Sequence, residues 1–350
     1  MSAKTKAGYV KPLDLRQGCV DLSHGGGGRA MQQLIAELFT RHLNNPFLAQ
    51  GNDGTCLPLE SGSLVVSTDS HVVSPLFFPG GDIGCLAVHG TVNDVAMMGA
   101  IPRYLTAGFI LEEGFPLGSL ERIIKSMAQA AQTAGVLVVA GDTKVVEAGK
   151  GDGLYITTTG VGFVPEGRHL SGHLAQPGDA ILISGTVGDH GMAIMSQREN
   201  LRFETPLRSD TAALNHLIQK LLAGEDGVRV LRDPTRGGVA ATLNEIAHQS
   251  GVGMLLDEAA IPLRPEVKAS CELLGLDPLN VANEGKVILI CAPESAQRLL
   301  QVMRQDDLGQ AAALIGQVTR DEHCFVQMTT SMGGRRMVDW LSGEQLPRIC

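Results

Sequence analysis

The sequence has no long apolar run and relatively little positive charge. No stretch approaches the roughly 18 apolar residues that a membrane span needs. The lysine-containing start of the chain has no apolar segment of the kind found in secretory signals. Lys and Arg number 28 against 37 Asp and Glu, a formal net charge of −9, whereas duplex binding depends on clustered positive charge. We therefore predict a cytoplasmic protein that binds neither nucleic acid nor a membrane.

Patterns typical of zinc sites, disulfide frameworks and P-loops are also missing. None of the seven cysteines forms C-x-x-C, and none of the ten histidines forms H-E-x-x-H. An odd number of cysteines in a chain expected in the cytoplasm argues against a disulfide framework. The pattern G-x-x-x-x-G-K-[ST] is absent, since the nearest stretch, EAGKGDG at 147–153, lacks its spacing. Any nucleotide must therefore be bound by another architecture.

Helix-like and strand-like apolar patterns alternate along the chain. The spacing predicts helices at 29–43, 117–134, 211–222, 237–249 and 294–303, and strands at 62–70, 136–140, 153–164, 179–185, 286–292 and 324–328. This alternation indicates α/β or α+β domains. A chain of 350 residues is longer than one hydrophobic core usually serves, so we expect two domains.

A segment rich in Pro, Gly and His between 165 and 178 divides the two halves, and we place the domain boundary there. The predicted organisation is an N-terminal extension (1–20), an N-terminal domain (21–165), a C-terminal domain (176–335) and a tail (336–350). The tail is Gly-rich and charged, with little apolar periodicity, so we predict that it is mobile.

Four consecutive glycines, Gly25, Gly26, Gly27 and Gly28, precede the first predicted helix. Glycine lets the backbone approach an anion closely, and the start of a helix offers free N–H groups and a partial positive charge. The motif therefore favours contact with a phosphate group. A flexible hinge before the helix is the alternative.

Five aspartates lie at the ends of apolar runs or in Gly-rich turns: Asp53, Asp69, Asp94, Asp142 and Asp233. Ligands of α/β folds bind beyond the carboxyl ends of the strands. Mg²⁺ is usually held by one or two carboxylates together with substrate phosphates. The set could hold more than one Mg²⁺ around a triphosphate. The alternative is that each aspartate is a turn or helix-cap residue.

Further polar residues stand near these positions. Lys144 lies two residues after Asp142, where it could neutralise phosphate or transfer a proton, although most lysines are simply solvated. Glu284 precedes a predicted strand and could face a cleft. Asp189 and His190 open a predicted helix, where an aspartate is typical of a cap. Alone, none of these residues specifies a reaction.

The ordered set of motifs resembles the HypE family of hydrogenase maturation factors, the carbamoyl dehydratases. The similarity runs from about Asp21 to Cys350, and the ordered set with a terminal cysteine is highly specific. This family is part of a superfamily with aminoimidazole ribonucleotide synthase, selenophosphate synthase and thiamine-monophosphate kinase. The motifs are SHGGGG, STDSHVVSPLFFPGGDIG, GTVNDVAMMGAIPRYL, GDTKVV, SGTVGDHG, DPTRGG, ANEGKV and the terminal PRIC.

The resemblance implies a two-domain fold like that of aminoimidazole ribonucleotide synthase. It also implies a homodimer formed through strands of the N-terminal domains, with Mg-ATP near that interface. The five aspartates match positions tied to Mg-ATP in the superfamily, and Lys144 and Glu284 match positions proposed for proton handling. The expected ATP contacts are Gly25–Gly28, Asp69, Asn93, Asp94, Asp142, Thr143 and Lys144.

The resemblance also explains a chain that ends in cysteine. It implies that a partner, HypF, places a carbamoyl group on the sulfur of Cys350. The chain then uses ATP to convert this thiocarboxamide into a thiocyanate, and Glu284 and Lys144 assist. The cyano group passes to the HypC–HypD complex and becomes an iron ligand of a [NiFe] hydrogenase. A mobile tail would let one thiol visit HypF, the ATP site and the acceptor.

Two other classes of protein compete with this interpretation. A small-molecule kinase of the same superfamily has no use for Cys350, and a selenophosphate synthase would need a reactive Cys–Lys pair near the Gly-rich loop, which the sequence does not contain. A scaffold that binds zinc through its terminal thiol would need several close Cys or His ligands. Mg-dependent ATP turnover that requires carbamoylation of Cys350 would distinguish all three.

Overall fold

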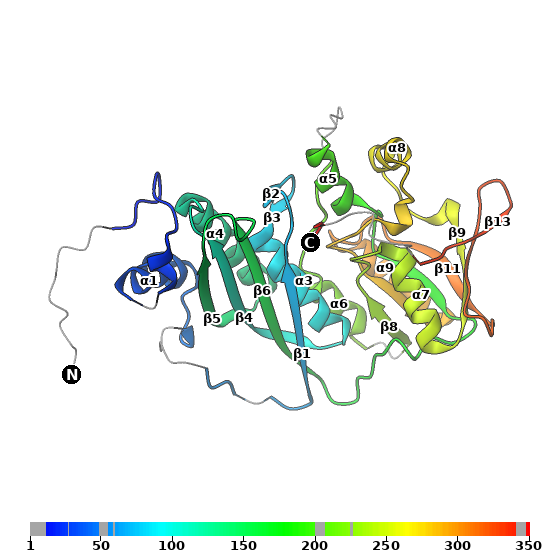
Figure 1. Ribbon diagram of the computed structural model, residues 1–350. Coiled ribbons are helices and arrows are strands. Elements are labelled where there is room, and N and C mark those ends of the chain that lie inside the picture. Colours follow the sequence, from blue (N-terminus) through cyan, green and yellow to red (C-terminus); the bar gives the residue numbers. More distant parts are fainter. Residues whose placement is uncertain are drawn as a thin grey trace.

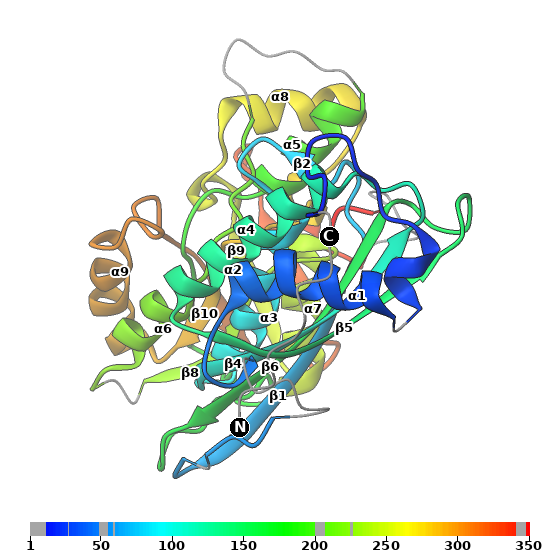
Figure 2. The same cartoon turned by 90° about the vertical axis from the view of Figure 1, so that its left-hand side faces the viewer.

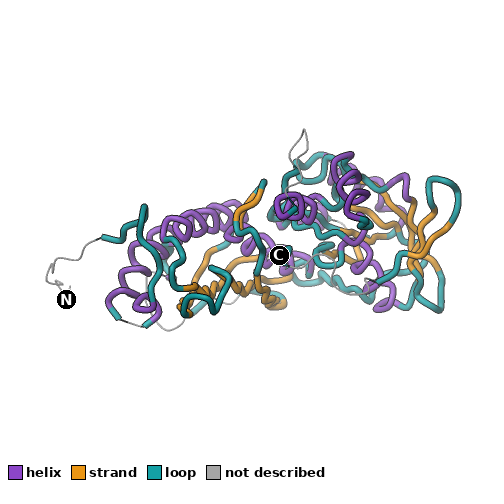
Figure 3. Tube along the Cα trace, turned by 45° about the horizontal axis from the view of Figure 1, so that its top comes forward, coloured by secondary structure: helices purple, strands orange, loops and turns teal. Residues whose placement is uncertain are grey.

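The computed structural model describes residues 12–26, 28–48, 55–58, 60–199, 207–224, 227–340 and 348–350. It forms two α/β domains that lie side by side, each built on its own sheet (Figure 1). The C-terminus lies between the two domains, and the tube in Figure 3 shows the same placement from a different direction.

The N-terminal domain is built on a four-stranded sheet in the order β1-β6-β4-β5. Only the pair β4–β5 is parallel. The strands are β1 (Ser63–His71), β4 (Ile101–Glu112), β5 (Leu137–Val146) and β6 (Leu154–Val164). A separate two-stranded ribbon consists of β2 (Phe77–Phe78) and β3 (Gly81–Asp82).

Helices cover one face of this sheet. They are η1 (Leu22–Gly25), α1 (Arg29–Leu34), the π-helical turn η2 (Ile35–Thr40), α2 (Arg41–Leu43), α3 (Ile83–Met97) and α4 (Leu117–Ala134). The apolar stripe of α4, including Leu120, Ile123 and Met127, is fully buried, and Gly135 ends the helix with φ 72°. Figure 2 shows α1, α2 and α4 in front of the sheet.

The opposite face of this sheet is largely open. Leu64 and Val66 of β1 are 56% and 58% exposed, and Ile110 of β4 is 45% exposed. Near one end, Phe47 and Leu57 pack across it against Tyr104. An apolar, Thr-rich sheet face left open in this way is typical of an interface.

The C-terminal domain contains a seven-stranded sheet in the order β13-β12-β9-β11-β7-β10-β8. Its strands are β7 (Ala180–Ile183), β8 (Val228–Arg232), β9 (Gly253–Asp257), β10 (Ile288–Cys291), β11 (Ala313–Thr319), β12 (Val326–Thr329) and β13 (Arg335–Met337). Its helices are α5 (Asp189–Arg198), α6 (Asn215–Leu222), α7 (Gly238–Ser250), η4 (Glu258–Ala260), α8 (Pro265–Leu274), η5 (Pro278–Asn280), η6 (Pro293–Ser295) and α9 (Ala296–Arg304). Residues of α7 pack on one face, and those of α6 and α9 on the other.

The predicted start of the tail needs correction. Residues 336 and 337 belong to β13, which pairs antiparallel with β12. The next residue, Val338, is buried, and its carbonyl accepts a hydrogen bond from Asn244. The sequence pattern missed β13 because three residues of an edge strand are too few to show a period.

Among the described residues, no helix combines the length and apolarity that crossing a bilayer requires.

Candidate functional site

The last three residues of the chain dock against the segment that follows β1. The backbone N–H of Val72 donates to a carboxylate oxygen of Cys350 at 3.1 Å, and that of Ser74 donates to the carbonyl of Arg348 at 3.1 Å. In return, Nε of Arg348 donates to the carbonyl of Val72 at 3.2 Å. These contacts involve the backbone of the tripeptide and its terminal carboxylate, so they fix how far the chain end extends along the segment after β1.

Side chains from both domains hold the same tripeptide. His190 of α5 contacts the carbonyl of Ile349 at 2.9 Å, and Arg198 of α5 donates to the carbonyl of Arg348. Arg348 also forms an ion pair with Asp152 at 2.9 Å. The side chain of Ile349 is buried in the core of the N-terminal domain. The chain end therefore occupies a defined position between the domains (Figure 1).

The docked thiol lies beside Glu284. Burial and then the charge of the Glu284 carboxyl group strongly raise the pKa of the Cys350 thiol, so the two side chains lie close together. Glu284 is only 3% exposed, and its Oε1 has no hydrogen-bond partner among the described residues. A buried carboxyl oxygen beside the terminal thiol, without a partner among the described residues, indicates a site for chemistry rather than for stability.

Glu284 is held by backbone contacts. Its N–H donates to Oδ1 of Asp210 at 3.0 Å, and Oδ2 of Asp210 accepts from Lys286 at 2.9 Å. Burial, followed by the charges of Asp233 and Asp210, raises the pKa of Glu284 well above the usual glutamate range. This carboxyl group is thus a stronger base than an ordinary glutamate once it is ionised.

Three predicted aspartates lie near Glu284, on three different elements. Asp69 of β1 lies 3.3 Å from His71, Asp94 of α3 accepts from Ser67 at 2.8 Å, and Asp233 follows β8. Burial and then the charge of Asp94 raise the pKa of Asp233 to about 7. The mutual influence of these carboxyl groups shows that they share one electrostatic environment.

A pocket of about 410 Å³ opens next to these carboxyl groups, between β1, α3 and the start of α7. Asp94 and Asp233 line it together with Arg232 and Arg236. The positive charge of Arg236 acts on both Asp69 and Cys350. It contributes to the lowered pKa of Asp69 and partly opposes the rise in the pKa of the Cys350 thiol. The pocket therefore combines carboxylates and guanidinium groups close to the docked chain end.

The described residues contain no group of three or more His, Cys, Asp or Glu side chains that could hold a metal ion unaided. Asp53 lies outside the described residues. Asp94 has a raised pKa, caused first by burial and also by the charge of Asp69, and a bound cation would relieve that repulsion. Carboxylate oxygens are the donors that Mg²⁺ prefers, and Mg²⁺ commonly takes its remaining ligands from phosphates and water. The donor chemistry therefore fits Mg²⁺ bound together with a nucleotide.

The structure separates Asp142 and Lys144 from this cluster. Asp142 aligns across the sheet with Gly108, Thr157 and Ser70. Directly opposite residues point to the same face and neighbours along a strand to opposite faces, so Asp142 points away from the face of Asp69. Its carboxylate pairs with Lys144 at 2.9 Å, and the two side chains are 64% and 63% exposed. Both lie on the open sheet face.

The Gly-rich loop lies beside the same strand. A side chain at Gly25 would come within 2.9 Å of the backbone nitrogen of Val145, so only glycine allows this approach. Gly28 precedes α1 with open space around it, Gly26 ends η1, and Gly27 lies outside the described residues. The loop and the Asp142–Lys144 pair thus form a second candidate area, on β5.

Thr143 and Asn93 have different surroundings from those expected of ATP ligands. Thr143 is buried and lines a small apolar pocket of about 100 Å³ with Met31 and Phe39. The amide nitrogen of Asn93 donates to the carbonyls of Ala212 and Glu284 at 3.0 and 3.4 Å. Both amide hydrogens are used in these contacts, so the geometry does not support Asn93 as a nucleotide ligand. It ties α3 to the backbone of Glu284 instead.

Sequence reasoning missed several residues of the crevice. Lys286 follows Glu284 by two positions, within the quoted motif ANEGKV, and could have been found there. His190 was noticed only as part of a helix start. The cap of that helix is Gly188 rather than Asp189, and His190 instead contacts the chain end. Asp210 carried no signal, because nothing around it in the sequence resembles a motif.

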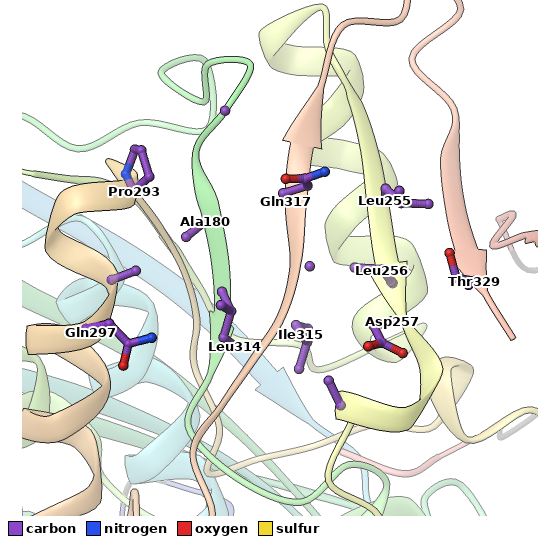
Figure 4. A pocket seen from close by; sticks show the side chains of 14 residues that line it. Ala180, Leu255, Leu256, Asp257, Pro293, Gln297, Leu314, Ile315, Gln317 and Thr329 are labelled. Atoms are coloured by element: carbon purple, nitrogen blue, oxygen red, sulfur yellow. The ribbon is translucent and has the colours of Figure 1, made fainter. Parts of the chain in front are cut away.

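A larger pocket of about 530 Å³ lies on the sheet of the C-terminal domain, between α9, β9 and β11 (Figure 4). Leu255, Leu314 and Ile315 contribute apolar surface, with Asp257 and Gln317 at its sides. None of the predicted site residues lines this pocket. It is therefore separate from the crevice that holds the chain end.

Comparisons with known proteins agree on one family. The N-terminal and C-terminal domains of AIR synthase related protein match residues 51–164 and 176–329. The carbamoyl dehydratase HypE of Cupriavidus necator is 63% identical over the whole of both chains. A crystal structure of hydrogenase maturation protein HypE in complex with ATP superimposes with a TM-score of 0.91 at 52% identity, covering 94% of this chain and 99% of that one. A HypE–HypF complex gives 0.78 at 49% identity, covering 88% and 99%.

Proposed function

Because this chain belongs to the carbamoyl dehydratase HypE family, a family of hydrogenase maturation enzymes, we propose that it dehydrates a carbamoyl group on its own Cys350 to a thiocyanate. One observation carries the proposal. The chain end is seated with its sulfur against Glu284, whose Oε1 is buried and has no partner among the described residues. A thiocarboxamide on that sulfur would present N–H groups to this oxygen.

ATP is required because the oxygen of an amide is a poor leaving group. The carbamoyl oxygen attacks the γ-phosphorus of ATP and ADP leaves, while one N–H proton is lost, which gives an S–C(=NH)–O–phosphate. Loss of the remaining N–H proton then forms the nitrile as the C–O bond breaks and phosphate departs. The net change is one thiocarboxamide and one ATP to one thiocyanate, ADP and phosphate, so the elements of water end in the phosphate.

Glu284 is the base in this scheme. A general base contributes about 10²- to 10⁴-fold, and it is most effective when its pKa lies near the working pH. The raised pKa of Glu284 brings it toward that range. Asp210 and Asn93 fix the Glu284 backbone through its N–H and its carbonyl, so the carboxyl group is aimed without its own oxygens being used.

Nucleotide binding is supported by the ATP complex of a HypE relative. The Gly-rich loop and Lys144 would contact phosphates, since both offer donors or positive charge beside β5. Asp69, Asp94, Asp142 and Asp233 supply carboxylates that would hold Mg²⁺ with the nucleotide, and Mg²⁺ would offset phosphate charge there.

A homodimer would unite the two areas. Within one chain, Asp142 and Lys144 lie on the open face of the N-terminal sheet, whereas Glu284 lies in the crevice. Exposed Leu64 and Val66 on the open face favour burial against a second copy. Packing two such faces about a two-fold axis would carry Asp142 and Lys144 of one chain toward the crevice of the other. The homodimer is thus part of the proposal.

The same thiol must leave the crevice to meet partners. A relative in this family forms a complex with HypF, and we propose that HypF carbamoylates Cys350 here, in the cytoplasm. We further propose the HypC–HypD complex as acceptor of the cyano group, destined for the iron of a [NiFe] hydrogenase. Release of the thiol would break hydrogen bonds worth about 1 kcal/mol net each, the Arg348–Asp152 ion pair and the burial of Ile349, so binding to a partner would have to offset these contacts.

Mass spectrometry of the C-terminal peptide tests the proposal. The full chain is incubated with HypF, carbamoyl phosphate and Mg-ATP, and the peptide is followed over time. We expect the mass of a carbamoyl adduct, followed by loss of the mass of one water in step with ATP consumption. A heavy-oxygen label in the carbamoyl group should appear in the released phosphate. Label found only in bulk water, or a carbamoyl adduct that persists, would contradict the mechanism.

A further inference from the structure

His190 lies where the chain end meets the C-terminal domain. It is completely buried at the start of α5. One ring nitrogen, Nε2, contacts the carbonyl of Ile349 at 2.9 Å, and the other, Nδ1, contacts the hydroxyl of Ser209 at 2.7 Å. The ring also packs edge-on against Phe78, with centroids 5.6 Å apart. Both polar atoms of the imidazole are therefore used, one on the tail and one on the body of the protein.

The partners determine the tautomer. A carbonyl can only accept a hydrogen bond, so Nε2 carries the proton and donates to Ile349. Nδ1 then accepts from the hydroxyl of Ser209. Burial lowers the pKa of His190, although the nearby charge of Asp210 and the Ile349 carbonyl act against this. The neutral ring suits both contacts.

Ser209 connects this histidine to the candidate base. The next residue is Asp210, whose carboxylate accepts from the N–H of Glu284 and from Lys286. The Ser209 hydroxyl also accepts from the N–H of Thr211 at 3.1 Å, which closes a turn around Asp210. One short segment thus contacts His190 on one side and Glu284 on the other.

We propose that His190 is a positioning residue for the dehydration. It holds the carbonyl of Ile349, and this contact places the sulfur of Cys350, one residue further on, beside Glu284. The inference rests on the proposed function and adds to it the side chain that sets the position of the tail relative to Glu284. Because the His190 ring and the Glu284 backbone both contact Ser209–Asp210, one connected set of hydrogen bonds sets the distance from the tail to the base. An error of about 1 Å in such a distance can cost about 100-fold in rate.

Two substitutions separate this role from simple core packing. The amide nitrogen of Gln reaches about as far as Nε2 of His, so His190→Gln keeps a donor for Ile349. The shorter amide of His190→Asn reaches about as far as Nδ1, so it keeps a contact with Ser209 and loses the tail. Both are polar and smaller than His, and Asn is one methylene shorter than Gln, so it leaves the larger void at this buried position; thermal unfolding measures that difference. Each is made in the full chain and carbamoylated by HypF.

The readout is the single-turnover conversion of the carbamoylated C-terminal peptide, with thermal unfolding and ATP binding measured in parallel. We expect His190→Asn to slow conversion by about tenfold or more, since it removes a hydrogen bond to a buried carbonyl, and His190→Gln to restore most of the rate. Carboxypeptidase should release Cys350 faster from His190→Asn than from His190→Gln. Carbamoylation by HypF should be equal in the two.

Equal rates for the two variants, whether both fast or both slow, would overturn the inference, as would equal protection of the tail. Loss of rate in proportion to loss of thermal stability would assign His190 to packing alone and also overturn it. The wild-type chain in the same assay tests the proposed function separately. If wild type leaves the carbamoyl group intact, the proposed function fails, whatever the variants do.

Discussion

The thiol of Cys350 lies so close to Glu284 that burial and then the charge of this glutamate raise the pKa of the thiol, although the two residues are far apart in the chain. This proximity joins two of the three residues predicted to be catalytic, Cys350 and Glu284, whereas the third, Lys144, lies on the open sheet face. The docked tripeptide brings them together through backbone contacts with Val72 and Ser74. The position of the sulfur therefore depends on the tail backbone, and its reactivity depends on Glu284.

Glu284→Gln should slow dehydration by about 10²- to 10⁴-fold, the usual contribution of a general base. The change keeps the shape of the side chain and removes the base, so the affinity for ATP should change little. Two quantities are measured: the rate at which the carbamoylated tail is converted in a single turnover, and the affinity for the nucleotide by calorimetry. Glu272→Gln on the exposed side of α8 is the matched control and should affect neither. Equal losses of binding and conversion would make Glu284 a structural or metal-binding residue instead.

Asp233→Asn should make stability less dependent on pH. Burial, followed by the charge of Asp94, raises the folded-state pKa of Asp233 from its ordinary value of 3.8 to about 7, so the folded state binds more protons than the unfolded one between these values. The contribution of Asp233 to the free energy of unfolding therefore falls as pH rises from about 4 to 7. At pH 8 the ionised Asp233 lowers the free energy of unfolding by at most ~4 kcal/mol, at about 1.4 kcal/mol per pKa unit. Solvent in the pocket makes the actual loss smaller.

We therefore expect Asp233→Asn to unfold at a higher temperature than wild type at pH 8 and at nearly the same temperature at pH 4, measured by thermal denaturation. ATP turnover should fall in the same variant, because the substitution removes a carboxylate from the proposed Mg-ATP site. Stabilisation that is equal at both pH values would show that the ionisation of Asp233 is not its cause.

Asp142→Asn should abolish ATP turnover and leave the fold intact, since the side chain is 64% exposed and lies on a regular strand. A mixing experiment then tests the shared site. An equimolar mixture of Asp142→Asn and Glu284→Gln chains, dissociated and reassociated, should regain about a quarter of wild-type dehydration, because half the dimers are mixed and each has one intact site. No recovery from a mixture shown to contain mixed dimers would place both residues in the same chain's site.

The sequence predicted the amphipathic helix α4 and the fully buried strands β7 and β10, but it missed the buried helix α3. The stripe of α4 alternates apolar and polar residues at helical spacing, so its bounds were predicted well. In contrast, α3 is apolar on nearly all sides, and twelve of its 15 residues are buried. Such a helix shows no period in the sequence. The edge strand β13 was missed for a different reason, because three residues are too few to show a period.

The candidate site was predicted as a set of residues but not as a geometry. Asp69 and Asp142 both read as carboxylates near strand ends, yet they point to opposite faces of one sheet, because the register of β1, β6, β4 and β5 fixes which residues are opposite. A single sequence does not reveal register. Asn93 was predicted to contact the nucleotide because of the motif around it. In the structure its side-chain amide instead donates to backbone carbonyls that lie 119 and 191 residues further along the chain.

Cys350→Ser should separate folding from function. Serine keeps the length of the chain and an oxygen in place of the sulfur, but it lacks thiolate reactivity. The docking contacts of Arg348 and Ile349 and of the Cys350 carboxylate do not involve the thiol, so the variant should still dock, bind Mg-ATP and dimerise. It should accept no carbamoyl group and support no hydrogenase maturation in cells. Maturation supported by this variant would contradict the role of the terminal thiol.

One alanine added after Cys350 should impair dehydration while ATP binding stays unchanged. The N–H of Val72 donates to a carboxylate oxygen of Cys350, and the extension turns this carboxylate into a neutral amide. A hydrogen bond to a charged group contributes about 1.5–3 kcal/mol, more than one to a neutral group. The added residue must also fit where the chain end now faces Glu284 and the pocket that Arg236 lines.

The measurement is conversion of the carbamoylated C-terminal peptide by mass spectrometry, in the extended chain and in wild type. A matched control replaces Met332, which is 94% exposed, with alanine and leaves the terminus as it is. We expect the control to convert at the wild-type rate and the extended chain to convert at least about tenfold more slowly, since it loses a charge-assisted contact. Conversion of the extended chain at the wild-type rate would show that the crevice is open beyond the cysteine. The terminal position of the thiol would then serve transfer to a partner rather than the dehydration.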